Sequence, residues 1–222
     1  MEAEASDGTR EGPATSVAAA VLAGGASRRM GRDKATLRVG GVELGRGVIG
    51  VAAGLANPVV VVAPDGHPAV ALAAEAGVGR VADPGRGPLA AVAAALGAPQ
   101  VREARHLLVL AADHPDLRVP LLSLLLDLRG LGEAVACRRG RGLEPLVAVY
   151  ERVPALGAAS ELLAGSGDGS MRSLLGALRT RVVEEGEWRR ADPDGASFLD
   201  LDDPDDLAAF RARMAGGGGR SG

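Results

Sequence analysis

The sequence is poor in aromatic residues, cysteine and lysine. Phe, Trp and Tyr make up 2% of its 222 residues, so a core must be built from Ala, Val and Leu. With so few aromatics, the stacking platforms that bind single-stranded nucleic acid are excluded. The formal net charge is −3, whereas nucleic acid and anionic membranes attract clustered positive charge. We therefore expect no nucleic-acid and no membrane partner, and favour a small one.

A single cysteine, Cys137, excludes an internal disulfide and a thiolate zinc site, and a lone thiol is typical of a reducing compartment. No apolar run approaches the ~18 residues of a membrane span. The run at residues 17–23 follows acidic residues and is at the short limit for a signal peptide. The sequence predicts a soluble, unprocessed, cytoplasmic protein.

Hydrophobic residues make up 47% of the chain and charged residues 24%, which is the composition of a folded protein. The polar residues 1–16 and the Gly-rich residues 215–222 are predicted to be disordered ends. The segment between them, 17–214, is predicted to form one domain.

Short runs rich in β-branched residues alternate along the chain with Ala/Leu-rich stretches of helical length. This pattern predicts the α/β class: a single doubly wound, mostly parallel sheet with helices on both faces. Strands are expected at residues 17–22, 58–63, 79–82, 106–111, 134–137, 146–150 and 180–184, and helices begin near residues 43, 67, 88, 120, 154 and 170. A last helix is expected over 204–214, with Asp203 as its N-cap and Pro204 at its first position.

The first expected strand runs into a glycine-containing loop, residues 22–34, with the sequence LAGGASRRMGRDK. Adjacent Gly24 and Gly25 let the backbone wrap a ligand, and Arg28, Arg29 and Lys34 add charge suited to a polyphosphate. Lys34 is the only lysine, which hints at a site where a guanidinium would not fit. Neither the P-loop nor the dinucleotide fingerprint fits. The alternative is a tight turn with incidental arginines.

Two aspartates follow expected strands, where open α/β sheets bind ligands. Asp113 follows a buried strand, and its carboxylate can hold a divalent cation or cap the turn before Pro115. Asp83, before Pro84, fits a turn residue equally well. We interpret Cys137 and the three histidines as structural, and the cluster Arg138, Arg139 and Arg141 as an exposed loop rather than a phosphate site.

The loop resembles the signature of the molybdenum cofactor guanylyltransferase family, Leu-Ala-Gly-Gly-x-Ser-x-Arg-Met-Gly-x-Asp-Lys, at every fixed position. Related families that use CTP typically have Leu-Ala-Ala-Gly, so Gly25 and the Asp33-Lys34 pair favour the guanylyl branch. The resemblance continues at Asp83-Pro84 with 87–89, at Asp113-His114-Pro115, at 144–146 with Tyr150, at 170–174 and at 198–207. It thus covers essentially the whole expected domain.

The resemblance implies a Rossmann-like nucleotidyltransferase that joins GMP from GTP to the terminal phosphate of the molybdenum cofactor (molybdopterin) and releases pyrophosphate. Arg29, Lys34 and Asp113 would be catalytic, and Mg²⁺ would be the cofactor. A chaperone or molybdoenzyme is a further expected partner. The residues expected to bind nucleotide are Leu22, Ala23, Gly24, Gly25, Lys34, Asp83 and Asp113, and those expected to bind metal are Asp113 and Asp202.

The sequence departs from the family pattern at two places. Asp200 and Asp202 stand where the family usually has Asn, so any contact that needs an amide donor is lost. Residues 62–64 are Val-Ala-Pro, where some relatives carry a nucleotide-contacting Asn. Two alternatives stay open: a cytidylyl or other nucleotidyltransferase that acts on a phosphorylated small molecule, and a GTP-binding module without turnover.

Overall fold

The computed structural model describes residues 16–24, 34–165, 169–201, 206–208 and 210–212. The strands are β1 (Val17–Leu22), β2 (Arg38–Val39), β3 (Val42–Glu43), β4 (Val59–Ala63), β5 (Gly79–Ala82), β6 (His106–Ala111), β7 (Ala134–Arg139), β8 (Gly142–Glu151) and β9 (Thr180–Val183). The α-helices are α1 (Leu44–Ala53), α2 (Ala69–Ala76), α3 (Pro88–Leu96), α4 (Val119–Asp127), α5 (Arg152–Ala164), α6 (Met171–Ala177) and α7 (Glu185–Trp188). Short 3-10 turns are η2 (Lys34–Thr36), η3 (Pro99–Val101) and η4 (Ala196–Phe198).

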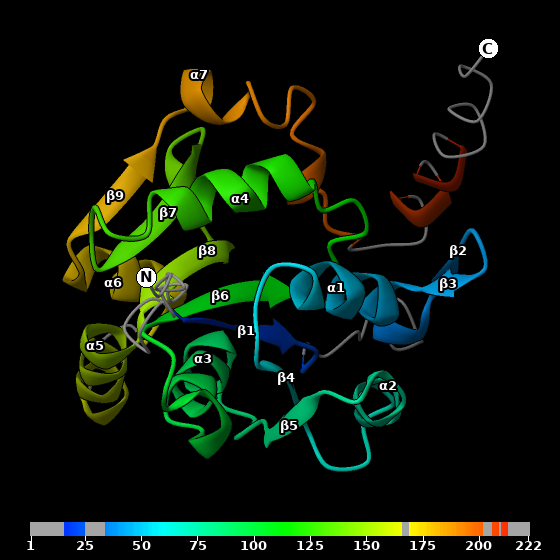
Figure 1. Ribbon diagram of the computed structural model, residues 1–222, viewed down its shortest axis with the longest axis horizontal. Helices are drawn as coiled ribbons and strands as arrows, with labels where there is room; N and C mark the ends of the chain where they lie inside the picture. Colours follow the sequence, from blue (N-terminus) through cyan, green and yellow to red (C-terminus); the bar gives the residue numbers. More distant parts are fainter. Residues whose placement is uncertain (1–15, 25–33, 166–168, 202–205, 209, 213–222) are drawn as a thin grey trace, which may run out of the picture.

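Seven strands form one sheet in the order β5-β4-β1-β6-β8-β7-β9, and β2 and β3 form a separate hairpin (Figure 1). β1 pairs in parallel with β4 on one side and β6 on the other. The chain therefore winds outward from β1 to β5 and then crosses back to β6. β8 runs antiparallel to both of its neighbours. The predicted doubly wound, mostly parallel sheet is confirmed.

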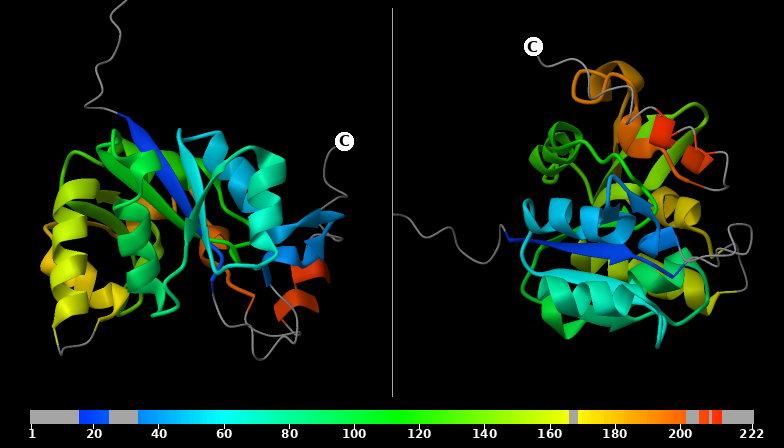
Figure 2. Two further views of the ribbon diagram at one scale, coloured as in Figure 1. Left: turned by 90° about the horizontal axis from the view of Figure 1, so that it is seen from below. Right: turned by 90° about the vertical axis from the view of Figure 1, so that its right-hand side faces the viewer.

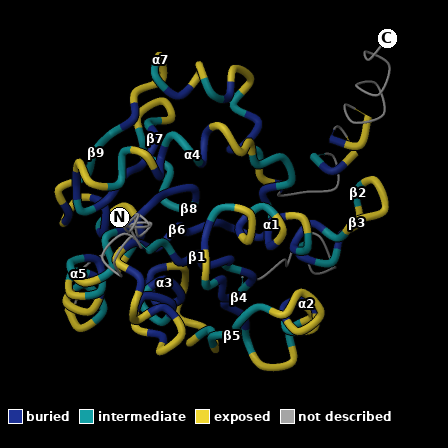
Figure 3. Tube along the Cα trace, in the orientation of Figure 1, coloured by how far each residue is buried: buried dark blue, intermediate teal, exposed yellow. Residues whose placement is uncertain are grey.

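Two layers of helices cover the sheet, one on each face (Figure 2). On one face, α1, α2, α4 and α7 pack over alternate strand residues such as Ala19 and Val21. On the other face, α3, α5 and α6 pack over Ala18 and Ala20. β4 and β6 are buried along their whole length, and Figure 3 shows the central strands enclosed between the layers. Burial on both faces explains their continuous apolar runs.

The expected strands all occur, and the six expected helices begin within two residues of the predicted positions. β8 differs most, because it begins at Gly142 rather than near residue 146 and runs antiparallel. The hairpin β2–β3 and the short helix α7 were not predicted from the sequence. Of the predicted disordered ends, residues 1–15 and 215–222 lie outside the described residues, whereas Ser16 is held in place, with its Oγ atom donating to Glu103 O at 3.0 Å. The start of the last helix at Asp203 and Pro204 also lies outside the described residues. No helix in the described ranges is long and apolar enough to span a membrane.

His106 is a buried titratable residue at the start of β6, on the edge of the sheet opposite the loop that follows β1. Its side chain is 5% exposed, and its Nδ1 atom has no hydrogen-bond partner among the described residues. Burial lowers the pKa of His106 below the ordinary 6.5, Arg105 and Arg129 lower it further, and the charge of Glu151 opposes the shift. The folded state therefore disfavours the imidazolium.

Because the unfolded chain binds this proton at higher pH than the folded chain, His106 makes stability fall as pH decreases through 6.5. We expect His106→Gln to lose less free energy of unfolding between pH 7.5 and 5.5 than the wild type. Urea unfolding at the two pH values measures this difference. Equal losses in the two proteins would contradict the burial argument.

Candidate functional site

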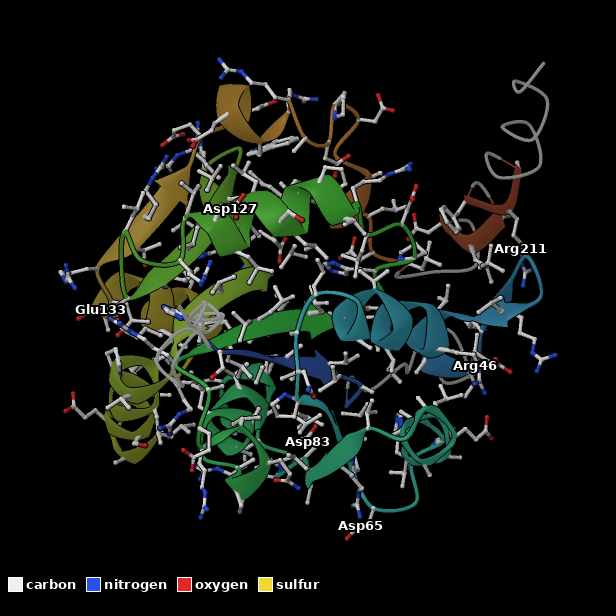
Figure 4. The ribbon with its side chains drawn as sticks, viewed as in Figure 1. Arg46, Asp65, Asp83, Asp127, Glu133 and Arg211 are labelled. Atoms are coloured by element: carbon white, nitrogen blue, oxygen red, sulfur yellow. The ribbon has the colours of Figure 1, made fainter. Side chains whose placement is uncertain are left out.

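A cavity of about 370 Å³ opens at the carboxyl ends of the parallel strands. It lies where the chain reverses direction across the sheet, the place at which open α/β sheets bind ligands. Figure 4 shows Asp83 at this edge, beside the ends of β1 and β5. The described residues that line the cavity are Leu22, Ala23, Gly24, Lys34, Ala35, Asp83, Gly85, Gly87, Pro88, Ala91, Ala111, Ala112, Asp113 and Leu146.

The backbone after β1 lies directly against the carboxylate of Asp83. The Ala23 amide donates to Val62 O at 2.9 Å, and the Asp83 amide donates to Ala63 O at 3.1 Å, so sheet-like bonds hold both segments. Asp83 Oδ1 accepts from the Gly85 amide at 2.8 Å. A Cβ atom on Gly24 would lie 1.7 Å from Asp83 Oδ2. Only glycine fits at position 24 while Asp83 keeps this position.

Lys34 and Asp113 form an ion pair across the cavity. Lys34 begins the turn η2, and Asp113 follows β6, where the Ala112 amide donates to Leu22 O at 2.9 Å. Lys34 Nζ donates to Asp113 Oδ2 at 3.0 Å, with side-chain exposures of 17% and 27%. The pair thus presents one cation and one carboxylate to a ligand, which suits a phosphate group and a hard divalent cation respectively.

The remaining walls come from the loop before α3 and from β8. Gly85 and Gly87 have φ values of +71° and +90°, in the region that glycine adopts readily. The loop leads into α3, which begins at Pro88 with its amino end at the cavity, and such an end carries partial positive charge. Leu146 adds an apolar wall. Tyr150 Oη donates to Pro145 O at 2.8 Å and so fixes the backbone just before Leu146.

The structure brings together six of the predicted site residues: Leu22, Ala23, Gly24, Lys34, Asp83 and Asp113 all line this cavity. Gly25, Arg29 and Asp202 lie outside the described residues. Sequence reasoning missed the small residues Ala35, Gly85, Ala91, Ala111 and Ala112. Their signal is weak, because an alanine at a strand end looks the same whether it lines a cavity or packs in a core.

The remaining candidates are held in the structure away from the cavity lining. His67 Nδ1 accepts from the Ala69 amide at the start of α2. His114 is 6% exposed, and its Nδ1 atom has no hydrogen-bond partner among the described residues. Burial raises the pKa of the Cys137 thiol to about 12, so it is not a nucleophile near neutral pH. Arg138 pairs with Glu184 and Arg139 with Glu144. Within the described ranges, no cluster of three or more His, Cys, Asp or Glu side chains could hold a metal.

Residues 19–182 match the family model of the MobA-like NTP transferase domain. The chain belongs to this family. It is 40% identical over 189 residues to a probable molybdenum cofactor guanylyltransferase of Opitutus terrae, covering 80% of this chain and 90% of the relative. It is 35% identical over 205 residues to a protein of the same name from Chloroflexus aggregans, covering 87% and 93% respectively.

Solved structures share the fold. The molybdopterin-guanine dinucleotide biosynthesis protein A of Archaeoglobus fulgidus superposes with a TM-score of 0.74 at 23% identity, covering 90% of this chain and 99% of that one. A CMP:2-keto-3-deoxy-manno-octonic acid synthetase in complex with CTP gives 0.67 at 15% identity, with coverages of 91% and 99%. The sheet of this MobA-like domain is therefore that of a nucleotidyltransferase.

The contact between Gly24 and Asp83 makes a testable prediction. In Gly24→Ala, the methyl group forces the Asp83 carboxylate out of position, so we expect nucleoside triphosphates to bind at least about tenfold more weakly, a loss of ~1.4 kcal/mol. Isothermal titration calorimetry measures the affinity.

The matched control is Gly47→Ala, in α1, where a Cβ meets nothing within 4 Å. This control should bind as the wild type does and be stabilised by up to ~1 kcal/mol, because alanine favours a helix over glycine. Unchanged affinity in Gly24→Ala would show that the close approach does not shape the binding site.

Proposed function

We propose that this chain transfers GMP from GTP to the terminal phosphate of the molybdenum cofactor (molybdopterin), giving molybdopterin guanine dinucleotide and pyrophosphate. The observation that carries the proposal is the Lys34–Asp113 pair at one cavity with the backbone of Leu22, Ala23 and Gly24. Membership of the family and the shared name of the curated relatives support it. We place the reaction in the cytoplasm, with a chaperone or molybdoenzyme receiving the product.

The reaction is an in-line attack of the acceptor's phosphate oxygen on the α-phosphorus of GTP, with pyrophosphate leaving. Such a transfer depends on positioning and charge neutralisation. In the proposal, the backbone at Leu22, Ala23, Gly24 and Gly25 wraps the nucleotide. Lys34, with Arg29, stabilises the negative charge that grows on the departing pyrophosphate. The attacking phosphate is already ionised near neutral pH, so no side chain has to remove a proton from it.

The donor set suits Mg²⁺. This ion is usually held by one or two carboxylates together with substrate phosphates, rather than by an all-protein cage. Asp113 offers a partly exposed carboxylate at the cavity, and no larger cluster of acidic or imidazole groups occurs among the described residues. We propose Asp113 and Asp202 as its protein ligands. When bound, the ion would neutralise phosphate charge and polarise the α-phosphorus.

Recognition of guanosine falls to Asp83 in this proposal. Its Oδ1 atom is held by the Gly85 amide, which leaves the carboxylate fixed at the cavity beside Gly24. A carboxylate fixed in this way can select a base or sugar whose N–H or O–H groups are placed to donate to it. A wrong ligand would leave the carboxylate desolvated and without a hydrogen bond. Residues 62–64, which are Val-Ala-Pro, can add only backbone contacts or apolar surface.

We expect GTP with Mg²⁺ to stabilise the protein more than CTP, ATP or UTP does. A ligand at 100 times its dissociation constant adds about 2.7 kcal/mol, which raises Tm by about 5 to 10 °C in a chain of this size. Asp113→Asn should lose the part of the shift that depends on Mg²⁺. Differential scanning fluorimetry measures these shifts.

Preference for CTP would make the chain a cytidylyltransferase. GTP binding without release of pyrophosphate, whichever acceptor is supplied, would make it a binding module.

Lys34→Ala should lower kcat by about two to three powers of ten, the usual loss when one group that stabilises transition-state charge is removed. The fold should persist, because partly exposed ion pairs contribute little stability. Release of pyrophosphate from GTP and molybdopterin measures the rate. The control Arg80→Ala removes another cation, one paired with Asp65 away from the cavity, and should keep the wild-type rate. A Lys34→Ala rate near that of the wild type would contradict the mechanism.

A further inference from the structure

The turn η4 is a buried element next to the site but outside the cavity lining. Ala196, Ser197 and Phe198 are each at most 2% exposed, and Asp192 is 1% exposed. The Asp192 carboxylate accepts from the Ala196 amide at 2.9 Å and from the Ser197 amide at 2.8 Å. A buried carboxylate satisfied by backbone donors holds one geometry, because any other leaves its charge unpaired.

Ser197 connects this turn to the loop that carries Asp113. Its Oγ atom accepts from the Arg118 amide at 2.8 Å, at the start of α4. The other end of the same loop is fixed where the Ala112 amide donates to Leu22 O. Asp113 therefore lies on a loop with an anchor on each side, and η4 supplies the one after it.

Phe198 connects the turn to the hairpin β7–β8. Arg139 Nη1 donates to Phe198 O at 3.1 Å, and the guanidinium lies 5.1 Å from the centre of the phenyl ring. Trp188 packs against the same ring in a T-shaped arrangement, with 5.0 Å between the ring centres. Arg139 also contacts Glu144 at 3.3 Å, and Glu144 Oε1 accepts from the amide of the cavity residue Leu146.

The chain that leaves η4 reaches the segment that carries Lys34. Leu201 is fully buried and packs in one cluster with the buried residues Leu37, Leu44 and Phe210. The partly buried Leu199 packs against this cluster. Leu37 comes directly after η2, and Leu44 begins α1 after the hairpin β2–β3, so both lie on the segment that continues from Lys34. Figure 1 shows the segment after α7 passing the start of α4, and the described residues 206–208 and 210–212 beside the hairpin. The turn is thus tied to the loop of Asp113 on one side and to the segment of Lys34 on the other.

We propose that η4 positions Asp113 relative to Lys34, with Ser197 and Arg139 as its positioning residues and Asp192 holding it in shape. The inference rests on the proposed function in one respect, because the consequence of a misplaced Asp113 is weaker binding of Mg²⁺ with GTP. In this proposal the side chains of Ser197 and Arg139 do not touch the substrate. They act through the backbone of the segments that they hold.

The decisive variant is Ser197→Ala, which removes only the acceptor for the Arg118 amide. We expect the Mg²⁺ concentration that half-saturates GTP binding to rise by about tenfold, the low end for a group that orients a metal ligand from outside its coordination sphere. Calorimetric titration of GTP at a series of Mg²⁺ concentrations, without acceptor, measures this change in the absence of turnover. Ser197→Thr keeps the hydroxyl group and should restore the wild-type value.

The matched control is Thr180→Val, which removes a hydroxyl hydrogen bond of the same 2.8 Å length, donated from Thr180 on the edge strand β9 to Leu175 O in α6. Both substitutions should lower Tm, but only Ser197→Ala should change the Mg²⁺ dependence. A half-saturating concentration that is the same in the two variants would overturn the inference while leaving the proposed function intact. A wild-type protein that binds no GTP with Mg²⁺ would overturn both.

A second pair of variants tests the same idea at the surface, in case Ser197→Ala fails to fold. Arg139→Gln releases Phe198 O, whereas Arg138→Gln removes the neighbouring ion pair to Glu184. Both side chains are nearly half exposed, at 46% and 40%, so both variants should fold. A raised Mg²⁺ requirement in Arg139→Gln alone supports the inference. A change confined to the KM of the phosphorylated acceptor would make Arg139 a substrate contact and overturn its positioning role.

Discussion

The parallel pairing of β1 between β4 and β6 is the constraint on which the site depends. Leu22 lies in register with Val62 on one side and with Ala111 on the other, so all three strands end at one edge. Gly24 follows β1 and Asp113 follows β6, so the register of these strands alone brings both residues to the same cavity. Asp83 joins them because β5 pairs in parallel with β4. β8 runs the other way, so its early residue Leu146 reaches the same edge.

Much of this arrangement was predictable from sequence, because the central parallel strands β1, β4 and β6 are buried on both faces and read as short apolar runs. The edge location of Gly24, Asp83 and Asp113 followed from that pattern and one rule about open sheets. The direction of β8 did not follow. Its cause is the tight connection at Gly140 and Arg141, which leaves room only for a hairpin. The cluster Arg138, Arg139 and Arg141, predicted to be an exposed loop, is in the structure the end of β7 with one residue of this connection.

The contacts that complete the site were beyond sequence reasoning for a different reason. Lys34 and Asp113 are 79 residues apart, as are Arg118 and Ser197, and no local pattern couples such pairs. The ion pair nevertheless gives a physical reason for the single lysine. A guanidinium tends to bind a carboxylate through both oxygens, whereas the Lys34 ammonium contacts Asp113 Oδ2 with one donor. A lysine in this position suits the proposal that the same carboxylate also binds a cation.

The scarcity of aromatic residues and the shape of the site are linked. A core of Ala, Val and Leu leaves small residues such as Ala111 and Ala112 at the strand ends, and these residues leave room for the cavity. The four aromatic residues of the chain are all buried, and none of them lines this cavity. Tyr150 holds Pro145 before the Leu146 wall, Trp188 and Phe198 pack together at η4, and Phe210 packs on the segment that follows Lys34. In the transfer that we propose, which depends on positioning rather than on a general base, these side chains act by fixing backbone segments and leave the cavity itself to small residues.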